Sequence, residues 1–189
     1  MQPAIDEVEV KTKAAKGASK KLAYLTTDIK NKALLSIADE LIANEKDMLA
    51  AICLAYAEGE NAGMGAAMLD RLLLTSERIQ AISSDVRNVA ALPDPVGETF
   101  EMRTLPNGLQ VSKRRVPLGV IGAIYESRPN VTVDISVLCL KSGNAIILRG
   151  GKEAIHSNSA LAKVIQNASY QAGVPEGAVQ FIEATDRAL

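Results

Sequence analysis

The spacing of apolar residues along the first half of the chain is helical. Apolar positions recur every three or four residues, which is the period of one face of an α-helix. Four such stripes precede residue 92: Ala15, Ala18, Leu22 and Leu25; Leu34, Ile37, Ala38 and Leu41; Met48, Ile52 and Ala55; and Ile79, Ile82, Val86 and Val89. Pro93 and Pro95 stop the last helix, because proline cannot continue one. We therefore predict that residues 1–97 are a region of amphipathic helices.

Small polar residues mark where these helices begin. Thr27 or Asp28 is placed to cap the second helix, Asn44 is placed to cap the third, and Ser76 opens the fourth. The side-chain oxygens of such residues accept N–H groups that have no partner within the first helical turn.

The period changes after the prolines. Residues 99–104 and 109–112 alternate between apolar and polar side chains, and Pro106, Asn107 and Gly108 lie between them. Alternation is the period of a strand and Asn-Gly is a turn signal, so a two-stranded hairpin with one apolar face is expected. A lone hairpin is marginally stable in water. We therefore expect residues 98–116 to form an arm that packs on something else, such as another subunit.

The last third of the chain predicts the order β-α-β-α-β. Residues 118–125, 145–149 and 177–182 are the apolar runs, and the continuity of the first is typical of a parallel strand covered on both faces. Pro129 and Gly143 bound the first intervening helix; Ser157 or Asn158 caps the second, which Gly173 ends. Right-handed crossovers make the three strands adjacent. The fold class is therefore α/β, with residues 117–189 as part of a parallel three-layer α/β/α nucleotide-binding sheet. Its unpaired apolar edge suggests either a fragment or a chain that borrows strands from a partner.

Composition narrows the function classes. Aromatic residues make up 3% of the chain, there is no Trp, and the formal net charge is −1. Nucleic-acid binders stack bases on aromatic rings and hold phosphates with a basic surplus, so no nucleic-acid partner is expected. The first thirty residues lack a secretory signal, and the run 116–125 is about half the length that spans a bilayer. We expect a cytoplasmic protein that does not associate with membranes.

The cysteines and the histidine predict no metal site and no disulfide. Cys53 and Cys139 are far apart in the sequence, and the single His156 cannot complete a zinc site with them. Both cysteines lie in apolar helical segments, where a thiolate is desolvated, so both are expected to be structural. His156 is expected at a helix entry or on the surface.

Two loops follow predicted parallel strands, at residues 125–130 and 149–158. Ligands of open parallel sheets bind at the carboxyl ends of the strands. In the second loop, Gly150 and Gly151 let a ligand approach the backbone, and Arg149 and Lys152 can meet phosphate. The fingerprint G-x-G-x-x-G is absent. The loop is thus either a plain turn with a solvated lysine or a phosphate-binding turn.

A long stretch resembles one family. The run RRVPLGVIGAIYESRPNVTVDISVLCLKSGNAIILRGGKEAIHSN (114–158) resembles gamma-glutamyl phosphate reductases, as do residues 68–97 and 173–187. The resemblance implies an aldehyde dehydrogenase-like fold: a cofactor domain, a catalytic domain with a cysteine nucleophile, and a hairpin arm used in homo-oligomerisation. Residues 1–97 would be the helical part of the cofactor domain, 98–116 the arm, and 117–189 a partial NADP-binding unit. The nucleophilic cysteine would lie in a later segment, so this N-terminal portion is expected to be inactive alone.

The resemblance implies NADPH-dependent reduction of L-glutamyl 5-phosphate to L-glutamate 5-semialdehyde, with release of phosphate, in proline biosynthesis. In that chemistry a cysteine thiolate displaces phosphate and hydride reduces the resulting thioester. Arg149 stands where relatives reach the adenosine ribose, beside Gly150 and Gly151. Lys152 stands where NAD-preferring relatives carry an acid, and a cation there favours NADP.

The first loop is assigned to the substrate by the same resemblance. Relatives carry an oxyanion-donating Asn in this loop; an ungapped count places Glu126 there, and a shift of four residues places Asn130 there. Ser127 and Arg128 are expected at the substrate, with Arg128 on the acyl phosphate or on the substrate carboxylate.

Two other functions stay open at this point. One is a different aldehyde dehydrogenase-like enzyme, against which the stretch SRPNVTVD (127–134) counts. The other is a non-catalytic nucleotide-binding or interaction module that uses the half sheet as a docking edge.

Overall fold

The computed structural model describes residues 2–61, 63–126 and 128–185. Its helices are α1 (Gln2–Leu22), α2 (Thr27–Ala43), α3 (Glu45–Asn61), α4 (Ala66–Leu72), α5 (Ser76–Ala91), α6 (Pro129–Lys141) and α7 (Ile155–Gln171). Its strands are β1 (Thr99–Thr104), β2 (Gln110–Arg114), β3 (Val120–Ile124), β4 (Ala145–Arg149) and β5 (Val179–Phe181), and a short 3-10 turn, η1 (Lys152–Ala154), precedes α7. The predicted α/β order of helical region, hairpin and parallel sheet is confirmed.

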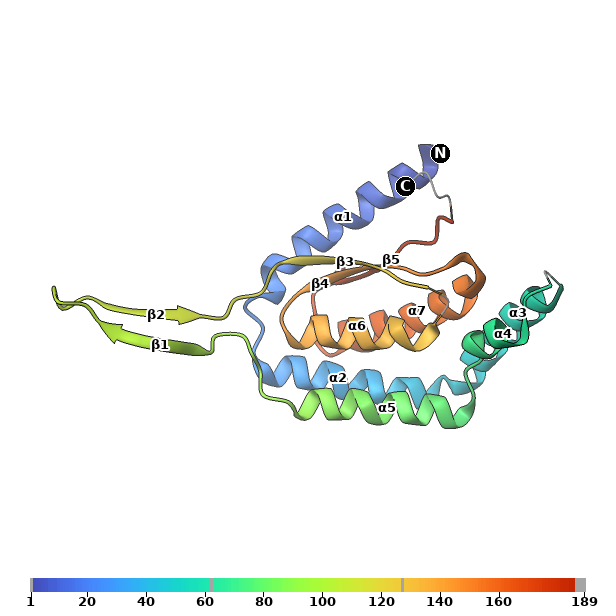
Figure 1. The fold of residues 1–189 in the computed structure, drawn as a ribbon, viewed down its shortest axis with the longest axis horizontal. Coiled ribbons are helices and arrows are strands. Elements are labelled where there is room, and N and C mark those ends of the chain that lie inside the picture. The colour runs from blue at the N-terminus through green and yellow to red at the C-terminus, as the bar shows by residue number, and fades with distance from the viewer. Residues whose placement is uncertain (1, 62, 127, 186–189) are drawn as a thin grey trace.

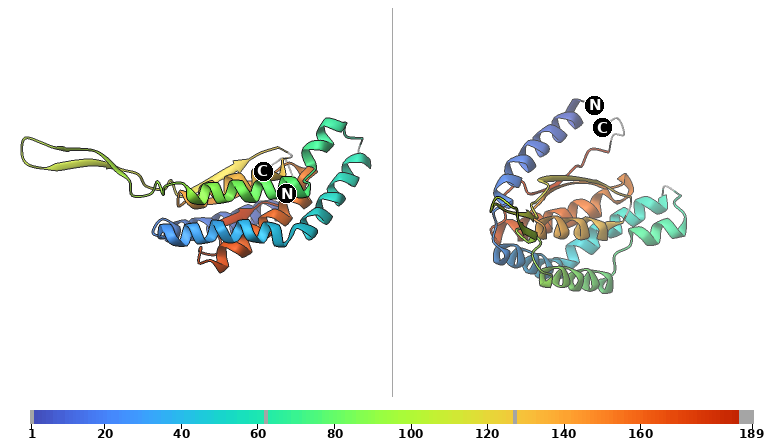
Figure 2. Two further views of the ribbon diagram at one scale, coloured as in Figure 1. Left: turned by 90° about the horizontal axis from the view of Figure 1, so that it is seen from below. Right: turned by 60° about the vertical axis from the view of Figure 1, so that its left-hand side comes forward.

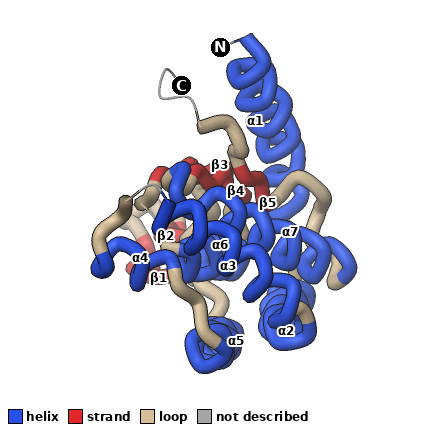
Figure 3. The backbone as a smooth tube through the Cα atoms, turned by 90° about the vertical axis from the view of Figure 1, so that its right-hand side faces the viewer, coloured by secondary structure: helices blue, strands red, loops and turns tan. Residues whose placement is uncertain are grey.

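The layers follow from the apolar stripes (Figures 1 and 3). The described residues of the four predicted stripes are buried, apart from Leu25 and Val89, which are half-buried. Helices α6 and α7 cover one face of the sheet, and α1 lies on the other face. Helices α2 and α5 form a further layer against α6 and α7. The sequence did not predict α4, whose seven residues are too few to show a helical period.

Most of the predicted caps are wrong. Thr26 caps α2 by accepting the N–H of Ile29 at 3.4 Å, while Thr27 donates instead to Asp94. Asn44 directly precedes α3, but its side-chain amide turns back to Glu40. Several polar residues compete for each helix start, and only the tertiary contacts decide between them.

Ser157 and Asn158 do not cap α7. The helix begins at Ile155, directly after η1, so both residues lie inside its first turns and are buried. Their side chains point into the protein, where the carbonyl oxygen of Asn158 accepts a hydrogen bond from Thr132 at 3.1 Å. The helix starts earlier than its cap-forming residue types indicate because η1 supplies its first turn.

The sheet has the predicted parallel order β3-β4-β5. Val120 pairs with Ala145, and Ile146 pairs with Val179. The expectation that residues 118–125 are covered on both faces is wrong, since Leu118 is 86% exposed and Ile124 is 83% exposed. Strand β3 is an edge strand, and α1 packs mainly over β4.

The hairpin of β1 and β2 projects from the body (Figures 1 and 2). Gly108 has φ +84° in its turn, a conformation that glycine adopts without strain. A bulge between Phe100 and Arg103, with Glu101 at φ 53°, interrupts the predicted alternation. Within the two strands only Phe100 and Val111 are half-buried, so the expected single apolar face is not continuous.

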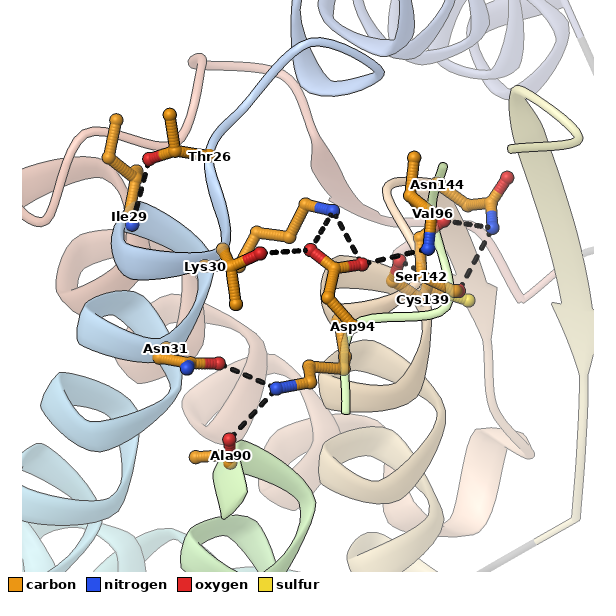
Figure 4. Close-up of polar contacts among 12 residues, drawn as sticks. Thr26, Ile29, Lys30, Asn31, Ala90, Asp94, Val96, Cys139, Ser142 and Asn144 are labelled. Carbon is orange, nitrogen blue, oxygen red and sulfur yellow. Dashed lines mark hydrogen bonds and ion pairs between the residues drawn. The ribbon is translucent and has the colours of Figure 1, made fainter. Parts of the chain in front are cut away.

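A buried ion pair holds the chain where it leaves α5 toward the hairpin (Figure 4). The ammonium of Lys30, only 1% exposed, lies 2.8 and 3.1 Å from the carboxylate oxygens of Asp94. The N–H of Val96 and the hydroxyl of Thr27 also donate to this carboxylate at 2.9 Å each. A buried pair of this kind is stable only when its remaining hydrogen bonds are made, as they are here.

Candidate functional site

The loop of residues 149–152 lines a cavity at the carboxyl ends of β3 and β4. The cavity measures about 380 Å³, and Arg149, Gly150, Gly151 and Lys152 share it with Ile124, Tyr125, Glu153 and Thr185. Arg149 is half-buried and Lys152 is exposed. The N–H of Tyr125 donates to the carbonyl of Arg149 at 3.1 Å, so the two strand ends are fastened side by side. The four residues assigned to a cofactor from the sequence therefore lie together.

Gly150 packs directly against a side chain of α7. A Cβ added to Gly150 would lie 2.1 Å from Nδ2 of Asn158 and 3.3 Å from Cε2 of Tyr125. Both distances are shorter than ordinary contacts, so Gly150 is required by the packing of the protein itself. The sequence indicated a glycine that lets a ligand approach, whereas the structure shows a close approach to Asn158.

A buried chain of hydrogen bonds lies behind this cavity. The hydroxyl oxygens of Tyr125 and Thr132 are 2.6 Å apart, and Thr132 also donates to Oδ1 of Asn158 at 3.1 Å. Burial raises the pKa of Tyr125 to about 12, although the contact with Thr132 opposes the rise, so the phenol stays protonated. The residue that follows β3 is thus joined to α6 and α7 by this chain of side chains.

The first loop lines a second cavity. Arg128 and Asn130 border a space of about 340 Å³ between α4, α5 and the first turn of α6. Its other lining residues are Asp70, Leu73, Leu74, Arg78, Ala81, Ile82, Asp85 and Pro129. Arg78 pairs with Asp70 at 3.1 Å on its rim. The loop of residues 125–130 thus contributes Tyr125 to the first cavity and Arg128 and Asn130 to the second.

Asn130 already has a partner within its own helix. Its amide nitrogen donates to Oδ2 of Asp134 at 3.3 Å, one turn along α6. Burial raises the pKa of Asp134, the contact with Asn130 opposes this, and the charge of Asp85 adds to the rise. Glu126 is exposed and accepts the N–H of Arg128 on its carbonyl at 2.9 Å, and it lines neither cavity. Ser127 lies outside the described residues.

The cysteines line neither cavity. Cys139 is buried on α6, and burial raises the pKa of its thiol to about 11, which opposes thiolate formation. Cys53 is exposed on α3, contrary to the expectation of a buried side chain, because the buried stripe of α3 runs through Met48 and Ile52. His156 is exposed in the first turn of α7. Among the described residues no three acidic, His or Cys side chains are grouped as metal ligands would be.

The sequence did not identify several residues that line these cavities. Tyr125 and Thr185 border the first cavity, and Asp70, Arg78 and Asp85 border the second. Tyr125 belongs to the predicted ligand loop of residues 125–130, although no role was predicted for its side chain. The others lie far from both loops along the chain, and only the fold brings them there.

No described helix is long and apolar enough to cross a bilayer.

Comparisons with known proteins agree with this architecture. The gamma-glutamyl phosphate reductase of Dehalococcoides mccartyi is 56% identical over the whole chain, which spans 45% of that relative's length. The crystal structure of the Thermotoga maritima gamma-glutamyl phosphate reductase superposes with a TM-score of 0.94 at 41% identity, covering 96% of this chain and 44% of that one. The Saccharomyces cerevisiae enzyme of the same name gives a TM-score of 0.87 at 34% identity, covering 93% and 46%.

The family assignment rests on a match that covers nearly the whole chain. The model of the aldehyde dehydrogenase family matches residues 3–189. The parallel sheet, its covering helices and the projecting hairpin are thus shared with solved members. This chain belongs to the aldehyde dehydrogenase family.

Proposed function

We propose that this chain is the cofactor-binding portion of a gamma-glutamyl phosphate reductase. The complete reaction converts L-glutamyl 5-phosphate, NADPH and a proton into L-glutamate 5-semialdehyde, NADP and phosphate, as a step of proline biosynthesis. The relatives that bear this name support the proposal, since the chain is 56% identical to one of them across its entire length.

The observation that carries the proposal is the cavity at the carboxyl ends of β3 and β4. It brings Arg149 and the exposed Lys152 to one opening, together with the backbone of Gly150 and Gly151. We infer that Arg149 binds the adenosine ribose and that Lys152 pairs with the 2′-phosphate of NADP. A lysine at this place attracts a phosphate and would leave the two hydroxyls of NAD without an acceptor. When bound, the cofactor supplies the hydride.

The second cavity is the proposed substrate side. Arg128 is exposed there and can bind the acyl phosphate or the carboxylate of the substrate bidentately. Asn130 is the better candidate for an oxyanion donor, because it lines this cavity and Glu126 does not. To donate to an oxyanion, the side-chain amide of Asn130 would have to break its hydrogen bond to Asp134, which is 3.3 Å long.

The nucleophile is proposed to come from elsewhere in the complete enzyme. The thiol of Cys139 is buried with a raised pKa, and the exposed Cys53 lines neither cavity. We expect the 189-residue chain to form no NADPH from L-glutamate 5-semialdehyde, NADP and phosphate. Turnover by the purified chain, followed by absorbance, would contradict this expectation.

Cofactor choice tests the proposal directly. Binding of NADPH can be followed by the fluorescence of its reduced nicotinamide, which absorbs at longer wavelengths than any side chain of the protein. Replacement Lys152→Glu should weaken NADPH binding by about tenfold and leave NADH binding unchanged or stronger, because a charge-assisted contact is lost. Lys163→Glu is the matched control, since Lys163 is an exposed lysine of α7 outside the cavity. An unchanged NADPH to NADH ratio in Lys152→Glu would exclude this role for Lys152.

A further inference from the structure

The segment that follows β5 is fastened to α1 by a single carboxylate. Oε1 of Glu7 accepts the backbone N–H of Glu183 at 2.9 Å, and Oε2 accepts that of Ala184 at 3.0 Å. Lys11, one turn further along α1, donates to Oε1 of Glu7 and to the carbonyl of Phe181, both at 2.5 Å. Figures 1 and 2 show this segment running beside the first turns of α1.

These contacts begin where the sheet ends. The last ladder bond of this strand is from the N–H of Ile182 to the carbonyl of Leu148, at 2.8 Å. The next two backbone N–H groups are those bound by Glu7, and the hydroxyl of Ser159 donates to the side chain of Glu183 at 2.9 Å. Glu7 therefore takes over the pairing of a backbone that no further strand residue holds.

The segment held by Glu7 leads directly into the first cavity, which is the proposed cofactor site. Thr185 follows Ala184 and lines that cavity with Arg149, Gly150 and Lys152. Two hydrogen bonds to an ionised carboxylate are stronger than bonds between neutral groups, so they restrict the backbone next to Thr185. The side chain of Glu7 is only 21% exposed, which limits the competition from water.

We propose that Glu7 is a positioning residue of the nucleotide site: by holding the backbone at residues 183–184, it fixes the part of the cavity wall that Thr185 forms. The inference rests on the proposed function of that cavity. If Glu7 has this role, then α1 takes part in cofactor binding, although it lies on the other face of the sheet from α6 and α7.

The same helix offers a matched control. Glu9 and Lys13 form a pair with the same spacing of four residues, at 3.3 Å, but their side chains are 63% and 78% exposed. Glu9→Gln removes the same charge from the same helix without touching residues 183–184. Glu7→Gln keeps the size of the side chain but leaves one acceptor oxygen for two N–H donors.

The test measures NADPH affinity and amide exchange on the folded 189-residue chain. In Glu7→Gln the amides of Glu183 and Ala184 should exchange faster, and the Kd for NADPH should rise about three- to tenfold, because the binding-competent wall is populated less. Glu9→Gln should change neither. Should Glu7→Gln fail to fold by circular dichroism, Glu7→Asp, which keeps the charge but is one methylene shorter, is measured instead, with the same result expected.

The two possible failures are distinguishable. If the unaltered chain binds NADPH and the Glu7 variants bind it with the same Kd despite faster amide exchange, the inference is wrong and the cavity keeps its proposed function. Equal weakening in the Glu7 and Glu9 variants would attribute the effect to helix charge and would also overturn it. If the unaltered chain does not bind NADPH, the proposed function of the cavity fails, and the inference fails with it.

Discussion

Residue 150 must be a glycine because a neighbouring side chain leaves no room for a Cβ atom. The added Cβ of any other residue would meet Nδ2 of Asn158 at 2.1 Å, and Asn158 is fully buried and held by Thr132. Nδ2 of Asn158 has no hydrogen-bond partner among the described residues. Asn158 and Gly150 are therefore packed against each other and are not joined by a hydrogen bond. The turn that carries Arg149 and Lys152 is thus set by a fit between a glycine and an asparagine.

This fit predicts the effect of two substitutions. Gly150→Ala should lower the free energy of unfolding by about 1–3 kcal/mol, the usual cost of forcing an extra methyl into a packed site. In the background Asn158→Ala, where the side chain that clashes is removed, the same change should cost clearly less. Urea unfolding of the four proteins gives the coupling energy.

Gly17 provides the control for this cycle. It lies inside α1, just before the last turn, and a Cβ added there meets nothing within 4 Å. Gly17→Ala should therefore raise the free energy of unfolding by about 0.5–1 kcal/mol, because alanine favours the helix. Additive effects of Gly150→Ala and Asn158→Ala would show that the two residues do not constrain each other.

Between elements, the Lys30–Asp94 pair ties α2 to the loop that follows α5. The neighbouring Lys141 of α6 is also buried and donates to Asn31 at 2.6 Å and to the carbonyl of Ala90 at 2.8 Å. Figure 4 labels these two partners, Asn31 and Ala90. Two buried lysines thus join α2, α5 and α6 at the base of the hairpin. Burial lowers the pKa of Lys141, and the nearby charge of Asp94 opposes this.

Removal of one partner of the Lys30–Asp94 pair should lower the free energy of unfolding substantially. Lys30→Met leaves the Asp94 carboxylate in a poorly solvated place, and we expect a loss of about 3 kcal/mol in the free energy of unfolding. Arg87→Met breaks a pair with Asp39 whose side chains are 46% and 68% exposed, and should cost less than about 1 kcal/mol. Equal costs in denaturant unfolding would mean that burial does not strengthen the Lys30 pair.

The same carboxylate predicts a dependence of stability on pH. Burial raises the pKa of Asp94, but the hydrogen bonds from Lys30, Val96 and Thr27 outweigh burial and leave the pKa below its ordinary value. Because the folded-state pKa is the lower one, the stabilisation is complete above the unfolded pKa of about 4 and is lost as the pH falls through the folded value. Between about pH 6 and about pH 3 the wild type should lose more unfolding free energy than Asp94→Asn. Identical losses would assign the acid sensitivity to other groups.

At the scale of the whole molecule, the hairpin stands apart from the core. It leaves the body at Gly97 and returns at Arg115, and these residues are joined by a hydrogen bond of 2.9 Å from the N–H of Gly97. Its apolar side chains include Met102, 69% exposed, and Leu109, 56% exposed. An arm that contributes little to the core and exposes apolar residues is suited to contact another copy of the chain, as we propose.

Shortening the arm tests this proposal. Thr99 pairs with Arg114, so residues 100–113 can be replaced by Asn-Gly, which closes a two-residue hairpin. The body should stay folded, as followed by circular dichroism, and light scattering should show a smaller assembly than that of the unaltered chain. An unchanged mass would place the subunit contact elsewhere.

The sequence by itself determined the elements and their order, with the exception of the short helix α4. Helical stripes, alternation in the hairpin and continuous apolar runs are local patterns, and each produced an element close to its predicted range. Pro129 at the start of α6, and Gly143 and Gly173 just beyond α6 and α7 with φ +73° and +105°, lie where short-range backbone geometry requires them. The turn at 149–152 was found because it directly follows a recognisable strand.

Only the tertiary structure decided which side chains meet. It placed Arg128 and Asn130 in a different cavity from Tyr125, matched Gly150 to Asn158, and brought Glu7 to a backbone 176 residues away. These contacts join segments that are distant in sequence, and periodicity carries no information about distant partners. The sequence pattern therefore predicts the helices and strands that form the layers of this protein. The side chains that line its candidate site come together only when these layers pack.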